Sequence, residues 1–200
     1  MRLLVASNNA GKIREIRALL ADTEVVSPAD LDLHLDVEET GTTFAANAAL
    51  KAHAFAQETG LVALADDSGL EVDALGGAPG VFSARYGDSS LDDVGRYRFL
   101  LQQMEPFPDG AQRTARFCCT MVAAAPDGRT CQSAGTCEGS IALAPSGDNG
   151  FGYDPIFVVA ERNCTMAQLD AATKNAISHR AQALKAIYPL LRQTFPELMS

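Results

Sequence analysis

Apolar residues recur along the chain with two periods, and together these predict strands and helices in alternation. A short buried strand is expected over residues 3–6, which form an apolar run. Residues 9–20 place their apolar side chains on one helical stripe, with Arg14, Glu15 and Arg17 off that stripe. The chain therefore begins with a strand that leads into an amphipathic helix.

Three further helices are expected from the same helical spacing. Residues 43–58 carry it, with threonine available as a cap at the start, and so do residues 91–104. The stretch from residue 178 onward is helical as well, and Pro189 is expected to kink or end that helix, because proline lacks the backbone N–H that a helix interior uses.

Strict alternation of apolar and polar residues marks the strands. Residues 115–123 alternate, and the Pro-Asp-Gly at 126–128 predicts a hairpin turn into a strand near 129–138. A further strand is expected over residues 156–159.

Residues 61–75 form a long apolar segment that a polar cluster interrupts. They predict two strands joined by a turn at Asp66-Asp67-Ser68-Gly69, because these residue types favour turns. Helices interleaved with both single strands and a hairpin indicate an α/β fold, with a central mixed twisted sheet flanked by helices.

Length and charge narrow the class of protein. A chain of 200 residues with 47% hydrophobic and 20% charged residues is a normal globular sequence, and one domain over residues 1–200 is expected. The net charge of -9 argues against a nucleic-acid polymer as a partner, since phosphate backbones require a basic surface. It leaves room for one small phosphorylated ligand.

Cysteine usage and hydropathy indicate a soluble cytoplasmic protein with no membrane segment. The five cysteines are odd in number, include an adjacent pair and form no CxxC motif, which predicts reduced thiols rather than disulfides or a zinc site. His34 and His53 are expected at the surface. The N-terminal apolar stretch is too short for a signal peptide, and no run approaches the length of a membrane helix.

The first candidate for chemistry is the segment from Ser7 to Lys12, which follows a strand and opens a helix. The N–H groups and the dipole of a helix N-terminus suit phosphate, and Lys12 adds a full positive charge. Compared with the P-loop GxxxxGKS/T, Ala6 and Ile13 replace the first glycine and the hydroxyl residue, so a metal must be held elsewhere. The alternative is an ordinary strand-to-helix connection.

The second candidate is a set of carboxylates. Asp66 and Asp67 are adjacent, so on a strand they would point in opposite directions and have different roles. Glu38 and Glu39 precede the second helix. Mg²⁺ binds one or two protein carboxylates together with phosphate oxygens and water. The alternative is a plain turn at the two aspartates.

Two further clusters lie near the C-terminus. In Gly150–Pro155, Phe151 stands between glycines and could stack on a base, since the chain has no tryptophan; alternatively the aromatics pack on the core. Lys174 and residues 178–180 could contact phosphate or a keto oxygen, or form a solvated helix start. Arg85 could line a cleft or form a simple salt bridge, and its spacing in the sequence does not decide between these two roles.

Five segments, in order, resemble the inosine triphosphate pyrophosphatase family, the Ham-type non-canonical purine nucleoside triphosphate pyrophosphatases, and bacterial members above all. They are SNNAGKIREI, EETGTTFAANAALKA, ALADDSGLEVDALGGAPGVFSARYG, GFGYDPIF and KNAISHRAQAL, and they span about residues 5–184. The resemblance implies an elongated two-lobed fold with a substrate cleft between the lobes. It also implies Mg²⁺-dependent hydrolysis of inosine, deoxyinosine or xanthosine triphosphate to the monophosphate and pyrophosphate, usually by a homodimer.

The resemblance also implies roles for individual residues. Glu39 and Asp67 would hold Mg²⁺, and Asp67 would be the base for the attacking water. The residues implied in substrate binding are Ser7, Asn8, Asn9, Ala10, Gly11, Lys12, Ser68, Phe151, Gly152, Tyr153, Asp154, Lys174, His179 and Arg180. The chain departs from many relatives at Ala46, where they have glutamate.

Two other functions compete with this one. A nucleotide-binding protein that does not hydrolyse would keep the phosphate loop and base pocket, and only Ala46 supports it. A phosphohydrolase for other modified nucleotides would differ in base preference.

Selection of a 6-keto purine requires donors such as His179, Arg180 or backbone N–H groups. Such donors would face the amino group of adenine unfavourably.

Overall fold

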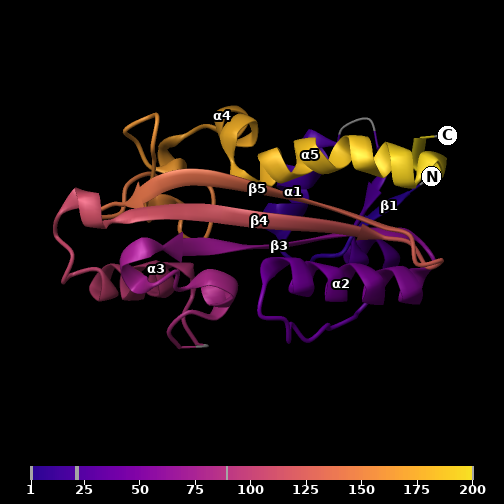
Figure 1. Cartoon of the computed structure of the whole chain (residues 1–200), viewed down its shortest axis with the longest axis horizontal. Helices are drawn as coiled ribbons and strands as arrows, with labels where there is room; N and C mark the ends of the chain where they lie inside the picture. The colour runs from indigo at the N-terminus through magenta and orange to yellow at the C-terminus, as the bar shows by residue number, and fades with distance from the viewer. Residues whose placement is uncertain (1, 21–22, 89, 200) are drawn as a thin grey trace. The chain divides into compact units, whose positions relative to one another are not determined.

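The computed structural model describes residues 2–20, 23–88 and 90–199, and over these residues the chain forms five α-helices and six strands (Figure 1). The helices are α1 (Ala10–Leu19), α2 (Phe44–Thr59), α3 (Asp93–Gln103), α4 (Ala171–Ile177) and α5 (His179–Thr194). The strands are β1 (Leu3–Val5), β2 (Val25–Val26), β3 (Val62–Val72), β4 (Thr114–Ala124), β5 (Thr130–Ile141) and β6 (Phe157–Val159).

The strands form one mixed sheet in the order β2-β1-β3-β4-β5-β6. β1 runs parallel to β2 and β3, whereas β5 and β6 are antiparallel. The mixed α/β fold that the sequence predicts is therefore confirmed. The hairpin turn is confirmed too, because the N–H of Gly128 donates to the carbonyl of Ala125 between β4 and β5.

The expected turn at Asp66-Asp67-Ser68-Gly69 is wrong. All four residues lie inside β3, a single strand of 11 residues. Turn-forming residue types remain extended here because both carboxylates are buried against cationic side chains, so the polar cluster is satisfied without leaving the strand.

Pro189 does not end the C-terminal helix, which was one of the two outcomes predicted for it, since α5 continues past it to Thr194. The proline removes one backbone hydrogen bond. The turns on both sides of it are anchored by fully buried side chains, Ile187 and Leu191, and this packing sustains the helix.

The chain divides into two compact units, and each consists of segments that are far apart in the sequence. The first unit comprises Met1–Asp67, Cys119–Gly135 and Arg180–Ser200, and the second comprises Ser68–Cys118 and Thr136–His179. The boundary within β3 falls between Asp67 and Ser68.

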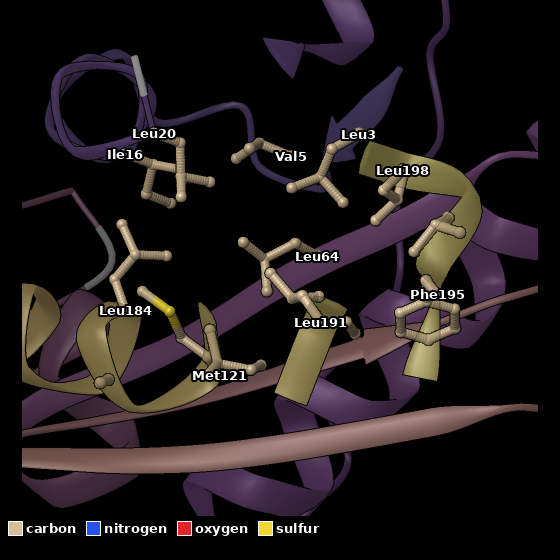
Figure 2. Close-up of a cluster of buried hydrophobic side chains, with 14 of the residues drawn as sticks. Leu3, Val5, Ile16, Leu20, Leu64, Met121, Leu184, Leu191, Phe195 and Leu198 are labelled. Carbon is tan, nitrogen blue, oxygen red and sulfur yellow. The ribbon is translucent and has the colours of Figure 1, made fainter. Parts of the chain in front are cut away.

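In the first unit, alternate residues of β3 pack against different helices. Val62 and Leu64 belong to a cluster with residues of α1 and α5. Figure 2 shows Leu64 in this cluster with Ile16 of α1 and Leu184 of α5. Ala63 and Ala65 belong to a second cluster, with residues of α2. The period of two along β3 therefore sends even-numbered side chains toward α1 and α5, and odd-numbered ones toward α2.

The second unit has its own core, built from the remaining parts of the long strands together with α3 and β6. Phe117 and Phe157 lie at its centre with their ring centroids 4.4 Å apart. The loop over residues 150–155 reaches this core through Tyr153, which is buried.

Candidate active site

The connection from β1 to α1 forms the helix start that the sequence predicts. Asn9 is the N-cap, and its side-chain oxygen accepts from the N–H of Lys12 at 3.1 Å. The hydroxyl of Ser7 accepts from the N–H of Asn9 at 3.2 Å. Asn8, Asn9 and Ala10 are exposed, which leaves the positive end of the helix accessible to an anion.

Asp66 holds Lys12 at this helix start. Its Oδ2 lies 3.0 Å from Lys12 Nζ and 3.2 Å from Arg180 Nε. Burial by itself raises the pKa of Asp66, but the charges of Lys12 and Arg180 outweigh burial and hold that pKa below its usual value. Asp66 is therefore a permanent anion that fixes the direction of the Lys12 side chain.

Glu15 completes this chain of ion pairs, and its position differs from the sequence prediction. The helical spacing predicts that Glu15 lies off the buried stripe of the first helix, but the residue is buried. Its Oε2 lies 2.5 Å from Arg180 Nη1. Arg180 is only 2% exposed. A carboxylate on each side offsets the cost of burying its guanidinium, which explains why Glu15 turns inward.

Asp67 points toward α2, opposite to Asp66. Its Oδ2 accepts from Asn47 Nδ2 at 3.1 Å, and its Oδ1 lies 3.7 Å from Lys51 Nζ. Burial raises the pKa of Asp67 above its usual value, and the attraction of Lys51 opposes this only in part. The prediction that the two aspartates point in opposite directions is confirmed.

Glu39 shares the ammonium of Lys51 with Asp67. Glu39 Oε1 lies 2.6 Å from Lys51 Nζ, and the negative charge of Glu39 adds to the rise in the pKa of Asp67. Two carboxylates thus converge on one cation. Within the described residues, no group of three or more histidine, cysteine or acidic side chains could hold a metal. A metal held here would take at most this pair from the protein, which matches the needs of Mg²⁺.

Asn47 and Lys51 are site residues that the sequence reasoning missed. They are four residues apart on α2, so they lie on one helix face, and both reach Asp67. Asn47 is fully buried, and its Oδ1 accepts from the N–H of Gly41 at 2.8 Å. The signal that could have identified them is their spacing of four within residues 44–52, where all the other residues are apolar.

In the second unit, Asp154 organises the glycine-rich loop. The carboxylate accepts from the N–H of Phe151 at 2.9 Å and from Lys174 Nζ at 2.6 Å. Asp154 and Lys174 are both buried. Gly150 has a φ of +81°, and a Cβ there would collide with the carboxylate of Asp154, so glycine is required at this position.

The two aromatic residues of this loop have different positions. Phe151 is half-buried, and Lys174 Nζ lies 4.7 Å from its ring centroid. Tyr153 is buried in the core and donates its hydroxyl to the carbonyl of Ser83 at 2.9 Å. The alternative of aromatics packed on the core therefore holds for Tyr153, whereas Phe151 keeps part of its ring surface exposed.

The cluster at the start of α5 is buried, so the alternative of a solvated helix start is wrong. Ser178, His179 and Arg180 are 6% exposed or less. The His179 ring stacks on Phe117 with centroids 4.8 Å apart. Ser68, which follows Asp67 on β3, is half-buried.

The remaining sequence predictions concern residues away from these clusters. All five cysteines are free, and His34 and His53 are exposed, as expected. Arg85 lies over the ring of Phe82, 5.2 Å from its centroid. Of the helices that the structure describes, none is long and apolar enough to cross a membrane.

Comparison with known proteins gives full-length matches. A model described as the Ham1 family matches residues 3–190. The chain is 48% identical to a dITP/XTP pyrophosphatase of Desulforamulus reducens over 98% of both proteins. It is similar to the solved Ham1 protein of Staphylococcus aureus, with a TM-score of 0.85, 41% identity and coverage of 96% of this chain and 99% of the other. A HAM1 protein from Coxiella burnetii matches with a TM-score of 0.86, 42% identity and the same coverage.

Proposed function

Because the chain belongs to the Ham1 family, we propose that it hydrolyses non-canonical purine nucleoside triphosphates, namely ITP, dITP and XTP, to the monophosphate and pyrophosphate. One observation carries the proposal. The two adjacent aspartates of β3 have different partners, so that one fixes Lys12 and the other stands beside Glu39 with a raised pKa. A triphosphate hydrolase requires both a cation for phosphate and a carboxylate for water.

Asp67 is assigned as the general base. Burial raises the pKa of Asp67, and a carboxylate with a raised pKa is a better proton acceptor. The oxygen of water forms a bond to the α-phosphorus, and the bond from that phosphorus to the bridging oxygen breaks. The water proton passes to Asp67, and pyrophosphate leaves with the bridging oxygen.

The convergence of Glu39 and Asp67 fits Mg²⁺, and these two residues would hold it. When bound, the ion would supply neutralisation of phosphate charge. Lys51, which forms ion pairs with the same two carboxylates, is assigned to offset the repulsion between them and to attract the triphosphate.

Lys12 and the start of α1 are assigned to the phosphates. Residues Ser7 to Gly11 offer N–H groups and short polar side chains, and Lys12 adds a charge whose direction Asp66 sets. Arg180 supports this arrangement through its ion pair with Asp66, in addition to the substrate contact expected of it.

The loop of the second unit is assigned to the purine base. Phe151 would stack on the base, and Gly152, Tyr153 and Asp154 would shape the loop around it. Ser68, Lys174 and His179 would complete substrate binding. Donors directed at a 6-keto oxygen would favour inosine and xanthosine over adenosine, since the amino group of adenine leaves those donors unpaired.

The test is the release of pyrophosphate from ITP, dITP, XTP, GTP and ATP, with and without Mg²⁺. Release from the first three far above GTP and ATP, and only with Mg²⁺, is expected. Binding of ITP without any release would favour the non-hydrolysing alternative. A clear preference for another modified base would favour the second alternative.

The protein is further proposed to act as a homodimer in the cytoplasm. An apparent mass of about twice that of the chain in light scattering is the expected result. A mass equal to that of one chain, at concentrations where the enzyme is active, contradicts the dimer but leaves the reaction unaffected.

A further inference from the structure

The first turn of α3 contacts the glycine-rich loop across 59 residues of sequence. Asp93 Oδ2 accepts from the N–H of Gly152 at 2.9 Å. Its other oxygen, Oδ1, accepts from Arg96 Nη1 at 3.1 Å. One carboxylate thus joins the helix to the loop that carries Phe151.

Arg96, in the same turn of α3, holds the carboxylate of Asp93 in place. Arg96 donates to the carbonyl of Leu91 through Nη2 at 2.6 Å, which fixes the guanidinium beside Asp93. The charges of Arg96 and Asp93 both influence the pKa of Tyr153, whose rise is caused chiefly by burial. The acceptor of the Gly152 N–H is therefore a carboxylate that Arg96 holds in place.

The loop depends on such contacts because its backbone has little rigidity of its own. Gly150 and Gly152 have φ values of +81° and +62°, a region that glycine enters readily and leaves as readily. Asp154 accepts from the backbone N–H of Phe151, in the peptide unit before this residue's side chain. Asp93 fixes the next N–H along the chain, so the Phe151 residue is held at both of its flanking peptide units.

We propose that Asp93 is a positioning residue for purine binding, which acts by holding the Gly152 amide and so the orientation of Phe151. This inference rests on the proposed function, because it concerns the base that the loop would bind. Asp93 lies outside every segment for which the sequence predicts a role in the reaction. Its loss should weaken nucleotide binding and leave the chemical step nearly unchanged, since the residues assigned to that step lie in the first unit.

The experiment compares three variants with the wild type. Asp93→Ala removes the acceptor for Gly152, and Asp93→Asn keeps an oxygen that can accept. Asp92→Ala is the matched control: Asp92 is the N-cap of α3 and accepts from the N–H of Gly95 at 2.7 Å. The substitution Asp92→Ala removes a carboxylate charge next to Asp93 and weakens the start of α3.

Two readouts are measured: the Kd of IMP by calorimetry, and the exchange rate of the Gly152 amide by NMR. For Asp93→Ala we expect a Kd about tenfold higher, a KM for ITP that rises in parallel, a kcat within about twofold of wild type, and faster exchange at Gly152. Asp93→Asn should recover most of the affinity. Asp92→Ala should lower the melting temperature and leave the Kd and Gly152 exchange at wild-type values.

The outcomes separate this inference from the function on which it rests. Equal effects of Asp93→Ala and Asp92→Ala, or a fall in kcat with no change in Kd, overturn the positioning role. A wild-type protein that neither binds IMP nor releases pyrophosphate from ITP overturns the proposed function and this inference together. Wild-type turnover with unchanged affinity in Asp93→Ala overturns the inference alone.

Discussion

Asp66 and Asp67 are consecutive residues of one strand, yet Asp66 Oδ2 lies 3.0 Å from Lys12 Nζ while Asp67 Oδ2 accepts from Asn47 Nδ2 at 3.1 Å. Two carboxylates of the same type thus serve different elements, α1 and α2. Their pKa values move in opposite directions as a result, that of Asp66 downward and that of Asp67 upward. Substitution of each should produce a different kind of defect.

Asp66→Asn should be a stability defect. It leaves the buried guanidinium of Arg180 and the ammonium of Lys12 without their shared anion, and loss of one partner of a buried ion pair costs about 3–5 kcal/mol. Urea unfolding measures this loss. Asp36→Asn, at an exposed position, removes the same charge and should change stability by less than about 0.5 kcal/mol. Equal effects of the two substitutions would contradict the ion-pair role.

Asp67→Asn should be an activity defect. The amide keeps an oxygen for Asn47 but cannot take a proton from water, so kcat for ITP should fall about 10²- to 10⁴-fold. Stability should change by less than about 1 kcal/mol, because burial already disfavours the charged form. Pyrophosphate release and urea unfolding on the same preparation check both statements. Turnover at the wild-type rate would remove Asp67 from the mechanism.

Lys51→Met should make the protein depend more strongly on Mg²⁺. Without the ammonium, Glu39 and Asp67 face each other uncompensated, which should cost about 2 kcal/mol in metal-free buffer. Added Mg²⁺ should then raise the melting temperature of this variant more than that of the wild type, since the ion replaces the missing charge. The same Mg²⁺ response in both proteins would argue against a cation site at this pair.

Gly41→Ala should disturb Asp67 from a distance. A Cβ at Gly41 would lie 2.6 Å from Asn47 Oδ1 and 2.7 Å from the Cβ of Ala46, so Asn47 must shift, and with it the hydrogen bond to Asp67. Turnover of ITP should fall about tenfold. Gly110→Ala is the control, because a Cβ there meets no atom within 4 Å. Wild-type turnover in Gly41→Ala would show that Asn47 does not set the position of Asp67.

Stability should fall in alkaline solution because of buried thiols. Burial raises the pKa of Cys119 from 9.0 to about 12. Below pH 9 the thiol is neutral in both folded and unfolded chains, whereas between 9 and 12 only the unfolded chain loses the proton, so stability falls as pH rises. At pH 10 this thiol should account for about 1 kcal/mol. Urea unfolding at pH 8, 9 and 10 should show a smaller slope in Cys119→Ala than in the wild type, and an identical slope would contradict the assignment.

The parts of the fold that follow from local pattern were predictable. The first helix was predictable because residues 9–20 carry their apolar side chains at helical spacing, and the β4–β5 hairpin because Pro-Asp-Gly follows an alternating segment. The prediction for β3 is wrong because residues 66–69 are typical of a turn, and the partners that suit them to a strand come from other elements: Lys12 and Arg180 for Asp66, and Asn47 and Lys51 for Asp67. Arg180 is 114 residues from Asp66.

The candidate site shows the same limit. Glu15 was placed on the polar side of its helix because its partner, Arg180, is 165 residues away. Asn47 and Lys51 were overlooked because each is unremarkable alone, and their common target on β3 becomes visible only when α2 packs against the strand. The local sequence does not show which distant residue a side chain will meet after tertiary packing, whereas residues 7–12 and residues 150–155 each lie together in the sequence.

The single strand that replaces the expected turn sets how this region tolerates insertion and deletion. β1 pairs with β3 in a fixed alignment, with Leu3 opposite Val62 and Val5 opposite Leu64. Removal or addition of one residue between that pairing and the aspartates would exchange their directions, so that the proposed base would face Arg180 and the ion-pair anion would face Lys51. Both residues would still be present in the sequence, and neither would have its partners. A change of two residues would restore their directions but displace them by roughly 7 Å along the strand, so length changes of either kind should separate both aspartates from their partners, even where single substitutions are harmless.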